Sequence, residues 1–258
     1  MSKIAIEHDG PLAVLTIESP PLNLFDGELM DELSQQVQRL AAEPPRGLLI
    51  RAEGRVVSGG VDVHVFDGLS PEQAARMWVQ LLALVHTVEQ LPLPTVFAAH
   101  SLCLTAAFEL SLGCDLLLAS ESARFGLVET VVGLTPAMGG TQRLAERAGP
   151  ARARELVMTG ELYDASTLER WNVVNRVLPD AGFDAAAREF ARRLADGPTK
   201  AHAATKAIVR AALDEGGAHG ADQRVPELAG DLFASEDLQN AVRSFLEQGP
   251  GHATYTGR

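Results

Sequence analysis

The sequence predicts an α/β fold in which a mostly parallel sheet is followed by a helical C-terminal region. Apolar runs typical of strands alternate with amphipathic segments through the first two-thirds of the chain, which indicates βαβ units. The final third shows helical spacing and no strand candidate. With 258 residues, 46% of them apolar, the chain can bury a sizeable core without disulfides or metals. We expect a core domain over 1–196 and a helical region over 197–258.

The first fifty residues predict a strand pair, a helix and a third strand. The two strands flank a tight turn at Asp9-Gly10. The helix has one apolar face, and Pro44-Pro45 ends it because proline lacks the N–H that a helix interior needs. The expected ranges are 4–8 and 12–17 for the strand pair, 28–43 for the helix and 47–51 for the third strand.

A capping motif begins the next helix. Ser70 can cap its N-terminus, Pro71 suits the first helical position, and Gln73 can complete a capping box. This helix is expected to run to about Gln90. Further along we expect strands over 95–99 and 115–119, a short helix over 105–112 between them, and mostly helices after residue 141, apart from one β-prone run at 172–178.

Two helices of the final third, over 201–213 and 236–247, carry apolar faces. No strand layer follows in the sequence that could cover these faces. Such faces are typically buried at subunit interfaces, so we expect self-association through this region.

The acidic charge of the chain restricts its partners. Lysine and arginine number 22 against 34 aspartates and glutamates, which gives a net charge of −12. Nucleic acids and anionic membranes repel such a protein, so we expect neither as a partner. An anionic small molecule remains compatible, because it needs only a local basic rim.

The two cysteines, Cys103 and Cys114, lie in apolar surroundings without C-x-x-C spacing. We expect buried, reduced thiols rather than a zinc site or a disulfide. The N-terminus lacks the layout of a signal peptide. The most apolar stretch, 94–119, is interrupted by His100, Glu109 and Asp115, which makes it a poor membrane span. We therefore expect a cytosolic (cytoplasmic) protein.

Two glutamates stand inside apolar runs. Glu109 lies in Leu-Thr-Ala-Ala-Phe-Glu-Leu, and Glu129 in Phe-Gly-Leu-Val-Glu-Thr-Val-Val. Burial of an unpaired carboxylate is unfavourable and raises its pKa, so two such groups could act as general base and general acid. The alternative is that each accepts a hydrogen bond in the core or pairs with an arginine such as Arg124 or Arg143.

Two loops of small residues follow apolar strands. They are Ser58-Gly59-Gly60-Val61-Asp62 and Leu104-Thr105-Ala106-Ala107. Small residues let backbone N–H groups approach a ligand closely, and two such groups aimed at one oxygen would form an oxyanion hole. The alternative is that both loops only serve turns or tight helix packing.

These motifs, in this order along essentially the whole chain, resemble the crotonase superfamily, also called the enoyl-CoA hydratase/isomerase family. The matching segments are Pro21-Leu22-Asn23, 58–63, Glu109-Leu110 with Cys114-Asp115, 123–129, 133–136, 139–144, Thr159-Gly160, and Phe245-Leu246-Glu247 with 255–258. The resemblance implies a spiral ββα core with a C-terminal helical trimerisation region, in a homotrimer or a dimer of trimers. It also implies an acyl-CoA or enoyl-CoA thioester as substrate and no metal or redox cofactor.

The resemblance further implies roles for single residues. The two hydratase glutamates fall on Glu109 and Glu129, and the two oxyanion-hole donors on the backbone N–H groups of Val61 and Ala106. Arg55 matches a basic position near the CoA phosphates. The remaining CoA and substrate contacts are expected along Val61, Asp62, Val63 and His64, together with Ala106 and Ala137.

The sequence departs from the family pattern in three places. Thr105-Ala106-Ala107 stands where the family has three glycines, and Ser101 replaces an earlier glycine of that loop. Pro136-Ala137-Met138-Gly139-Gly140 replaces Pro-Gly-Ala-Gly-Gly. Each backbone N–H is retained, but each added Cβ narrows the approach to it and is expected to exclude strained φ angles. Substrate shape and rate should therefore change more than thioester binding.

Three functions follow from these motifs. In an enoyl-CoA hydratase, Glu109 would deprotonate a water as it adds to Cβ, and Glu129 would give a proton to Cα. The altered loop at Thr105 motivates a second function, another enolate reaction such as isomerisation, hydrolysis or carbon–carbon cleavage. The third is a non-catalytic CoA- or RNA-binding scaffold, and the acidic charge with only three lysines disfavours RNA.

Overall fold

A six-stranded sheet forms the centre of the molecule in a computed structural model, which describes residues 2–258. Strands β1 (Ile4–Asp9) and β2 (Leu12–Ile17) form an antiparallel hairpin. From β2 onward all neighbours are parallel, in the order β3 (Gly47–Ala52), β4 (Thr95–Ala99), β6 (Leu116–Ser120) and β9 (Arg176–Leu178). The predicted α/β fold with a mostly parallel sheet is confirmed.

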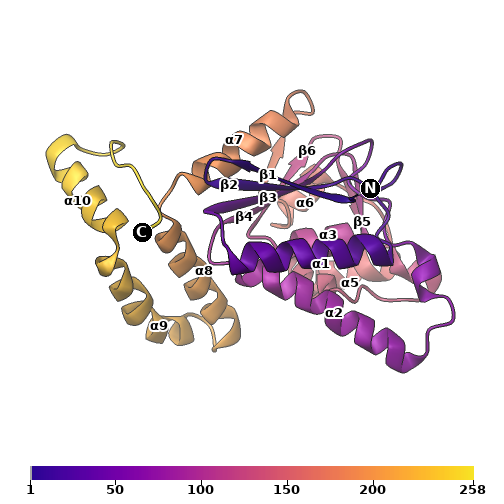
Figure 1. Cartoon of the computed structure of the whole chain (residues 1–258). Helices are drawn as coiled ribbons and strands as arrows, with labels where there is room; N and C mark the ends of the chain where they lie inside the picture. The colour runs from indigo at the N-terminus through magenta and orange to yellow at the C-terminus, as the bar shows by residue number, and fades with distance from the viewer. Residues whose placement is uncertain (1) are drawn as a thin grey trace.

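Helices cover both faces of this sheet, which is why every residue of β2 is buried. Alternate residues of β2 reach the two faces: Leu12 and Val14 pack with α7 (Phe183–Ala195), and Leu15 belongs to the main core. The helices of the main core, on the other side of the sheet in Figure 1, are α1 (Gly27–Ala42), α2 (Pro71–Gln90) and α3 (Thr105–Leu112).

Local capping sets where α1 and α2 begin. The Asp26 carboxylate accepts a hydrogen bond from Leu29 N at 2.8 Å. At α2, Ser70 Oγ accepts from Gln73 N at 3.3 Å, and Gln73 Oε1 accepts from Ser70 N at 2.8 Å. The predicted capping box is confirmed, and so is the end of α2 at Gln90.

Three short strands form a second sheet in the order β5 (Leu102–Leu104), β7 (Arg124–Gly126) and β8 (Tyr163–Asp164). No sequence pattern predicts them, because two or three residues are too few to show strand periodicity. Cys103 of β5 also forms an isolated parallel bridge with Ser58, which ties β5 to the loop after β3. Both cysteines are free and buried, as predicted, and burial raises the pKa of each thiol.

The β-prone run at 172–178 is a strand only at its end, β9. Asn172 has a φ of +61°, and this left-handed conformation ends the preceding turn. The N–H groups of Val173 and Val174 then both donate to Leu168 O, at 2.9 and 3.2 Å, so they cannot join a sheet.

The remaining helices fall into two groups. Helices α4 (Gly140–Ala148), α5 (Pro150–Thr159) and α6 (Ala165–Arg170) pack with the core. Helices α8 (Thr199–Asp214), α9 (Ala218–Asp231) and α10 (Glu236–Gln248) form an arm that extends away from the sheet (Figure 1). The helices predicted over 201–213 and 236–247 are thereby confirmed.

Polar contacts hold this arm against the core. Lys206 Nζ lies 2.9 Å from Asp115 Oδ2, and Arg46 donates to Gly197 O at 2.7 Å and to Tyr255 O at 3.0 Å. Large apolar side chains of the arm are exposed in the single chain, namely Val209, Leu213, Phe233, Val242, Phe245 and Leu246. The division into 1–196 and 197–258 stays a prediction. Across residues 2–258, no helix has the length and hydropathy needed to span a bilayer.

Candidate active site

A largely apolar cavity of about 230 Å³ lies among α2, α3 and two 3-10 turns, η1 (Val63–Phe66) and η2 (Glu129–Val132). The residues of the sequence prediction that line it are Val61, Val63, Glu109, Glu129 and Ala137. Two larger clefts flank α8, but none of the predicted site residues lines either of them. The cavity therefore brings the two glutamates and the first small-residue loop together.

Glu109 lies on α3, a helix whose eight residues are all buried. The side chain is 3% exposed, and its Oε2 accepts hydrogen bonds from Met138 N and Gly140 N, both at 2.8 Å. Burial raises the pKa of Glu109 to about 7, and the N–H donors and the Arg143 charge oppose that rise. Neither Arg124 nor Arg143 forms an ion pair with Glu109 among residues 2–258.

Gly140 permits this contact because it has no side chain. A Cβ at this position would lie 2.6 Å from Glu109 Cγ and 3.0 Å from Glu109 Oε2. Both hydrogen bonds to the carboxylate depend on that close approach of the backbone.

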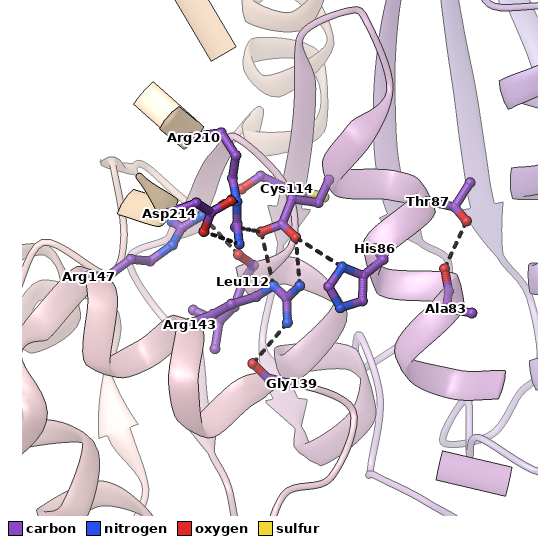
Figure 2. A network of polar contacts seen from close by, with 11 residues as sticks. Ala83, His86, Thr87, Leu112, Cys114, Gly139, Arg143, Arg147, Arg210 and Asp214 are labelled. Atoms are coloured by element: carbon purple, nitrogen blue, oxygen red, sulfur yellow. Dashed lines mark hydrogen bonds and ion pairs between the residues drawn. The ribbon is translucent and has the colours of Figure 1, made fainter. Parts of the chain in front are cut away.

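Arg143 and Arg210 form a cluster around Glu89, beside the backbone segment Gly139-Gly140 that contacts Glu109. Arg143 donates to both carboxylate oxygens of Glu89, at 3.2 and 2.7 Å, and to Gly139 O at 3.3 Å. Arg210 of the helical arm donates to the same Glu89 at 2.9 Å. Figure 2 shows Arg143 and Arg210 converging here, with Gly139 below Arg143. Since Gly139 precedes Gly140, the cluster holds in place the backbone that contacts Glu109.

Glu129 occupies a different environment at the first position of η2. Its Oε2 is buried and has no hydrogen-bond partner within the described part of the chain. Burial, and secondly the charge of Glu109, raise the pKa of Glu129 to about 8. The two carboxylates therefore interact, and the second one keeps its proton more readily than the first.

The loop after β3 presents one unused backbone donor. Gly60 N donates to Ser58 Oγ at 3.0 Å, and Asp62 N donates to Phe25 O at 3.1 Å. The N–H of Val61, between them, has no acceptor among the residues that the structure describes. Val61 lines the cavity, so its N–H is available to a ligand there.

The second unused donor lies at the N-terminus of α3. Ala106 is the second residue of this helix, and Leu104, its N-cap residue, forms no side-chain hydrogen bond to the helix. The first N–H groups of a helix have no partner within the helix itself, so that of Ala106 is free of one. Ala106 is fully buried, and Thr105 beside it lines the cavity.

One expectation about this loop is wrong. The Cβ atoms of Ser101 and Thr105 were expected to exclude strained φ angles, yet the two residues have φ values of +54° and +45°. The flanking short strands and the buried helix α3 hold both residues in the left-handed region, although it is unfavourable for a β-branched threonine.

Four predicted CoA or substrate contacts lie outside the cavity lining: the buried Ala106, and three residues nearer the surface, Arg55, Asp62 and His64. Asp62 caps η1 and lies 2.6 Å from Nδ1 of His64, which lowers the pKa of Asp62 and raises that of His64. The His64 side chain is exposed. Arg55 is also exposed and forms no ion pair or hydrogen bond within residues 2–258.

Sequence reasoning missed the aromatic and sulfur-containing part of the lining. Phe66 of η1 and Trp78 of α2 lie with ring centroids 5.7 Å apart, and Met77 and Leu81 line the same wall. The amphipathic pattern of α2 indicates a buried face. It does not show which residues of that face meet a cavity.

Comparison with known proteins agrees with this geometry. Residues 7–255 match the family model described as enoyl-CoA hydratase/isomerase. The chain is 29% identical to the "Probable enoyl-CoA hydratase" of Bacillus subtilis, covering 96% of this chain and 97% of that protein. It is 26% identical to the short-chain-enoyl-CoA hydratase of Clostridium acetobutylicum, covering 96% of each. The crystal structure of enoyl-CoA hydratase from Bacillus anthracis superposes over 100% of both chains with a TM-score of 0.91 at 25% identity.

Proposed function

The chain belongs to the enoyl-CoA hydratase/isomerase family and is a hydratase of the crotonase type, and from this we propose that its cavity adds water across the 2,3 double bond of an enoyl-CoA thioester. The supporting observation is the pairing of Glu109 and Glu129 in one apolar cavity, with the pKa of each raised to near neutrality. Carboxylates in that range can both release and accept a proton at neutral pH.

We assign the thioester oxygen to the backbone donors of Val61 and Ala106. As hydroxyl adds to Cβ, negative charge moves onto this oxygen and gives an enolate. Two backbone N–H groups that the fold holds in place, and that have no competing acceptor in the described chain, would stabilise that charge. Ala137 and Val63, which line the cavity, would contact the acyl part of the substrate.

The two glutamates then divide the proton transfers. Glu109 accepts two backbone hydrogen bonds that favour its ionised form, so it acts as the base that takes a proton from the attacking water. Glu129 has an unpartnered oxygen and the higher pKa, so it is protonated and gives its proton to Cα. One water is consumed and no electrons leave the substrate, so this chemistry requires neither a metal nor a redox cofactor.

We place the nucleotide end of CoA at the exposed side chains of Arg55 and His64, which lie at the two ends of the loop after β3. The Arg55 guanidinium has no partner in the described chain and can contact a phosphate. Asp62 raises the pKa of His64 and so favours its positively charged form. Each charge-assisted hydrogen bond of this kind contributes roughly 1.5–3 kcal/mol. A weaker affinity of Arg55→Ala for CoA thioesters would support this placement, and an unchanged affinity would refute it.

For the assembly we propose a homotrimer or a dimer of trimers that works in the cytosol. The exposed apolar side chains of α8 and α10 provide the surface that a neighbouring subunit would bury. Light scattering at micromolar concentration tests this directly, because a stable monomer would contradict it. The net charge of −12 argues against nucleic-acid partners, and a gel shift at low salt should show no RNA binding.

A panel of trans-2-enoyl-CoA substrates tests the proposed reaction. Hydration removes the conjugation between the double bond and the thioester, so the absorbance of that chromophore should fall with time. Product analysis with trans-3-enoyl-CoA substrates runs in parallel. Efficient isomerisation without hydration would overturn the hydratase assignment.

A further inference from the structure

The Thr105 hydroxyl is a buried donor without a partner. Thr105 is 6% exposed, and its Oγ1 is buried and forms no hydrogen bond in residues 2–258. Buried polar atoms are nearly always paired, so each exception needs an explanation. The buried unpaired side-chain atoms of the described chain are Thr105 Oγ1, Glu129 Oε2, Thr141 Oγ1, His202 Nε2 and Ser244 Oγ. Of these residues, only Thr105 and Glu129 line the cavity.

The position of this hydroxyl relates it to both oxyanion donors. Thr105 directly precedes Ala106 in the chain. Its Oγ1 lies 2.9 Å from the place that a Cβ on Gly60 would occupy, and Gly60 directly precedes Val61. Thr105 therefore precedes one backbone donor, Ala106, and its hydroxyl lies against Gly60, which precedes the other donor, Val61.

From this arrangement, and resting on the proposed function, we propose that Thr105 Oγ–H is a third hydrogen-bond donor to the thioester oxygen. The substrate oxygen would supply the acceptor that the hydroxyl lacks in the free chain. This hydrogen bond strengthens as charge builds on the oxygen in the enolate, so it favours the transition state over the bound substrate.

Glu109 is the other group that the hydroxyl could serve. Residues 105 and 109 are one turn apart on α3 and share a face. The oxygen Oε2 of Glu109, however, already accepts from Met138 N and Gly140 N, and no hydrogen bond joins Thr105 to Glu109. The backbone of Thr105 has a φ of +45°, a conformation that is strained for threonine and that glycine would adopt without strain. The presence of threonine despite this strain is consistent with a use for its hydroxyl.

The test compares Thr105→Val with Thr105→Ser. Valine keeps the shape and β-branching, and hence the backbone strain, but lacks the hydroxyl. We expect Thr105→Val to lower kcat about tenfold or more with KM within about twofold, because the lost contact forms mainly in the transition state. Thr105→Ser, which keeps the hydroxyl, should stay within about threefold of the unchanged chain.

A second readout reports on the oxygen itself. In butyryl-CoA carrying ¹³C at the carbonyl, which cannot be hydrated, hydrogen bonding lowers the frequency of the infrared carbonyl stretch. The frequency in the bound state should be lower with the unchanged chain and Thr105→Ser than with Thr105→Val. Should Thr105→Val not fold, as a urea melt would show, Thr105→Ala takes its place in both measurements.

Three outcomes would overturn the inference. Equal kcat and equal carbonyl frequency in Thr105→Val would make the hydroxyl a packing group only. Equal losses in Thr105→Val and Thr105→Ser would show that shape, not the hydroxyl, matters. A loss of kcat with an unchanged carbonyl frequency and a shifted pH profile would place the hydroxyl with Glu109. Failure of the unchanged chain to hydrate any enoyl-CoA would instead count against the proposed function.

Discussion

The two walls of the cavity that carry the carboxylates are built in opposite ways. Glu109 lies on a fully buried helix, and two N–H groups donate to it. Glu129 lies on a four-residue turn whose Val131 and Val132 are 81% and 52% exposed, and no donor reaches its buried oxygen. Burial raises the pKa of both, but Glu109 accepts two hydrogen bonds from other residues that favour its ionised form, whereas at Glu129 only its own backbone N–H acts in that direction. In the proposed mechanism, this difference is what makes Glu109 the base and Glu129 the acid.

The largest expected effect comes from removing either carboxylate. Glu109→Gln and Glu129→Gln should each lower the hydration rate at least about a hundredfold, the usual size of a general acid–base contribution. Glutamine keeps the shape and hydrogen-bonding capacity, so folding and thioester binding should stay largely intact. Steady-state hydration and calorimetric binding of butyryl-CoA measure the two effects separately.

Isomerase activity sharpens the comparison between the walls. Both reactions need a proton transfer at Cα, to Cα in hydration and from Cα in the isomerisation of trans-3-enoyl-CoA, which then regains a proton at Cγ. Glu129→Gln should therefore abolish both activities. Only hydration needs an activated water, so Glu109→Gln should impair isomerisation much less. Equal losses of both activities in Glu109→Gln would mean that the roles given to the two walls are wrong.

A methyl group placed against Glu109 should produce the next largest effect. In Gly140→Ala the new Cβ would meet Glu109 Cγ at 2.6 Å and displace the carboxylate from its two N–H donors. We expect about a ten- to hundredfold loss of kcat and a destabilisation of about 1–3 kcal/mol. Hydration kinetics and urea unfolding measure the two changes.

Gly230→Ala is the matched control for this substitution. Gly230 lies in α9, and a Cβ there would meet no atom within 4 Å. Alanine favours a helix over glycine, so this variant should keep full activity and gain up to about 1 kcal/mol. Similar behaviour of the two variants would show that close packing on Glu109 has no special role.

The pH dependence of hydration should report the ionisation of both Glu109 and Glu129. The base must be ionised and the acid protonated, so activity should rise through pH about 7, the pKa of Glu109, and fall through about 8, the pKa of Glu129. A narrow bell with its maximum between these values is expected for kcat/KM. A flat profile from pH 5 to 10 would exclude the proposed acid–base pair.

An element of this fold is predictable from the sequence when the residues that determine it lie close together in the chain. The start of α2 is predicted to the residue, because Ser70, Pro71 and Gln73 form a capping box within one turn. Strands β5, β7 and β8 are not predicted, because their pairing depends on residues far away in sequence. The run at 172–178 shortens to β9 for a local reason that a strand pattern does not show: the N–H groups of Val173 and Val174 both donate to Leu168 O, at the end of the preceding helix.

Site residues are predictable from the sequence where their polarity differs from that of their neighbours in the chain. Glu109 and Glu129 are conspicuous as carboxylates in apolar runs, and the structure brings them to one cavity. Trp78 is not conspicuous, because an aromatic residue on an amphipathic helix is usual. Thr105 shows only as a departure from a glycine pattern, and its unpaired hydroxyl becomes visible once Gly60 is placed against it.

The smallest expected effect concerns stability on the Glu129 wall. The pKa of Glu129 is about 8 in the folded chain and near 4.5 when unfolded, so the folded state holds its proton over that range. Stability is therefore fully present below pH 4.5 and declines as the pH rises through about 8. Glu129→Gln should raise Tm at pH 9 relative to the unchanged chain, by about 2–4 °C per kcal/mol recovered.

At pH 5 this gain in Tm should be much smaller, because Glu129 in the folded chain is then protonated and resembles glutamine. Thermal unfolding followed by circular dichroism at pH 5, 7 and 9 would measure it. Glu43→Gln, at the exposed end of α1, is the control and should show no such pH-dependent gain. A constant Tm difference at all three pH values would contradict an ionisation-dependent cost at Glu129.

The isolated β-bridge between Cys103 and Ser58 makes the local opening of this region measurable by the reactivity of a thiol. The Cys103 thiol is fully buried and weakly acidic in β5, so an alkylating reagent can reach it only after β5 has separated from the loop after β3. That separation would also dislodge the segments that carry Val61 and Ala106. The alkylation rate of Cys103, compared with that of the equally buried Cys114, therefore tells how often the catalytic scaffold loosens on its own, without unfolding of the whole chain.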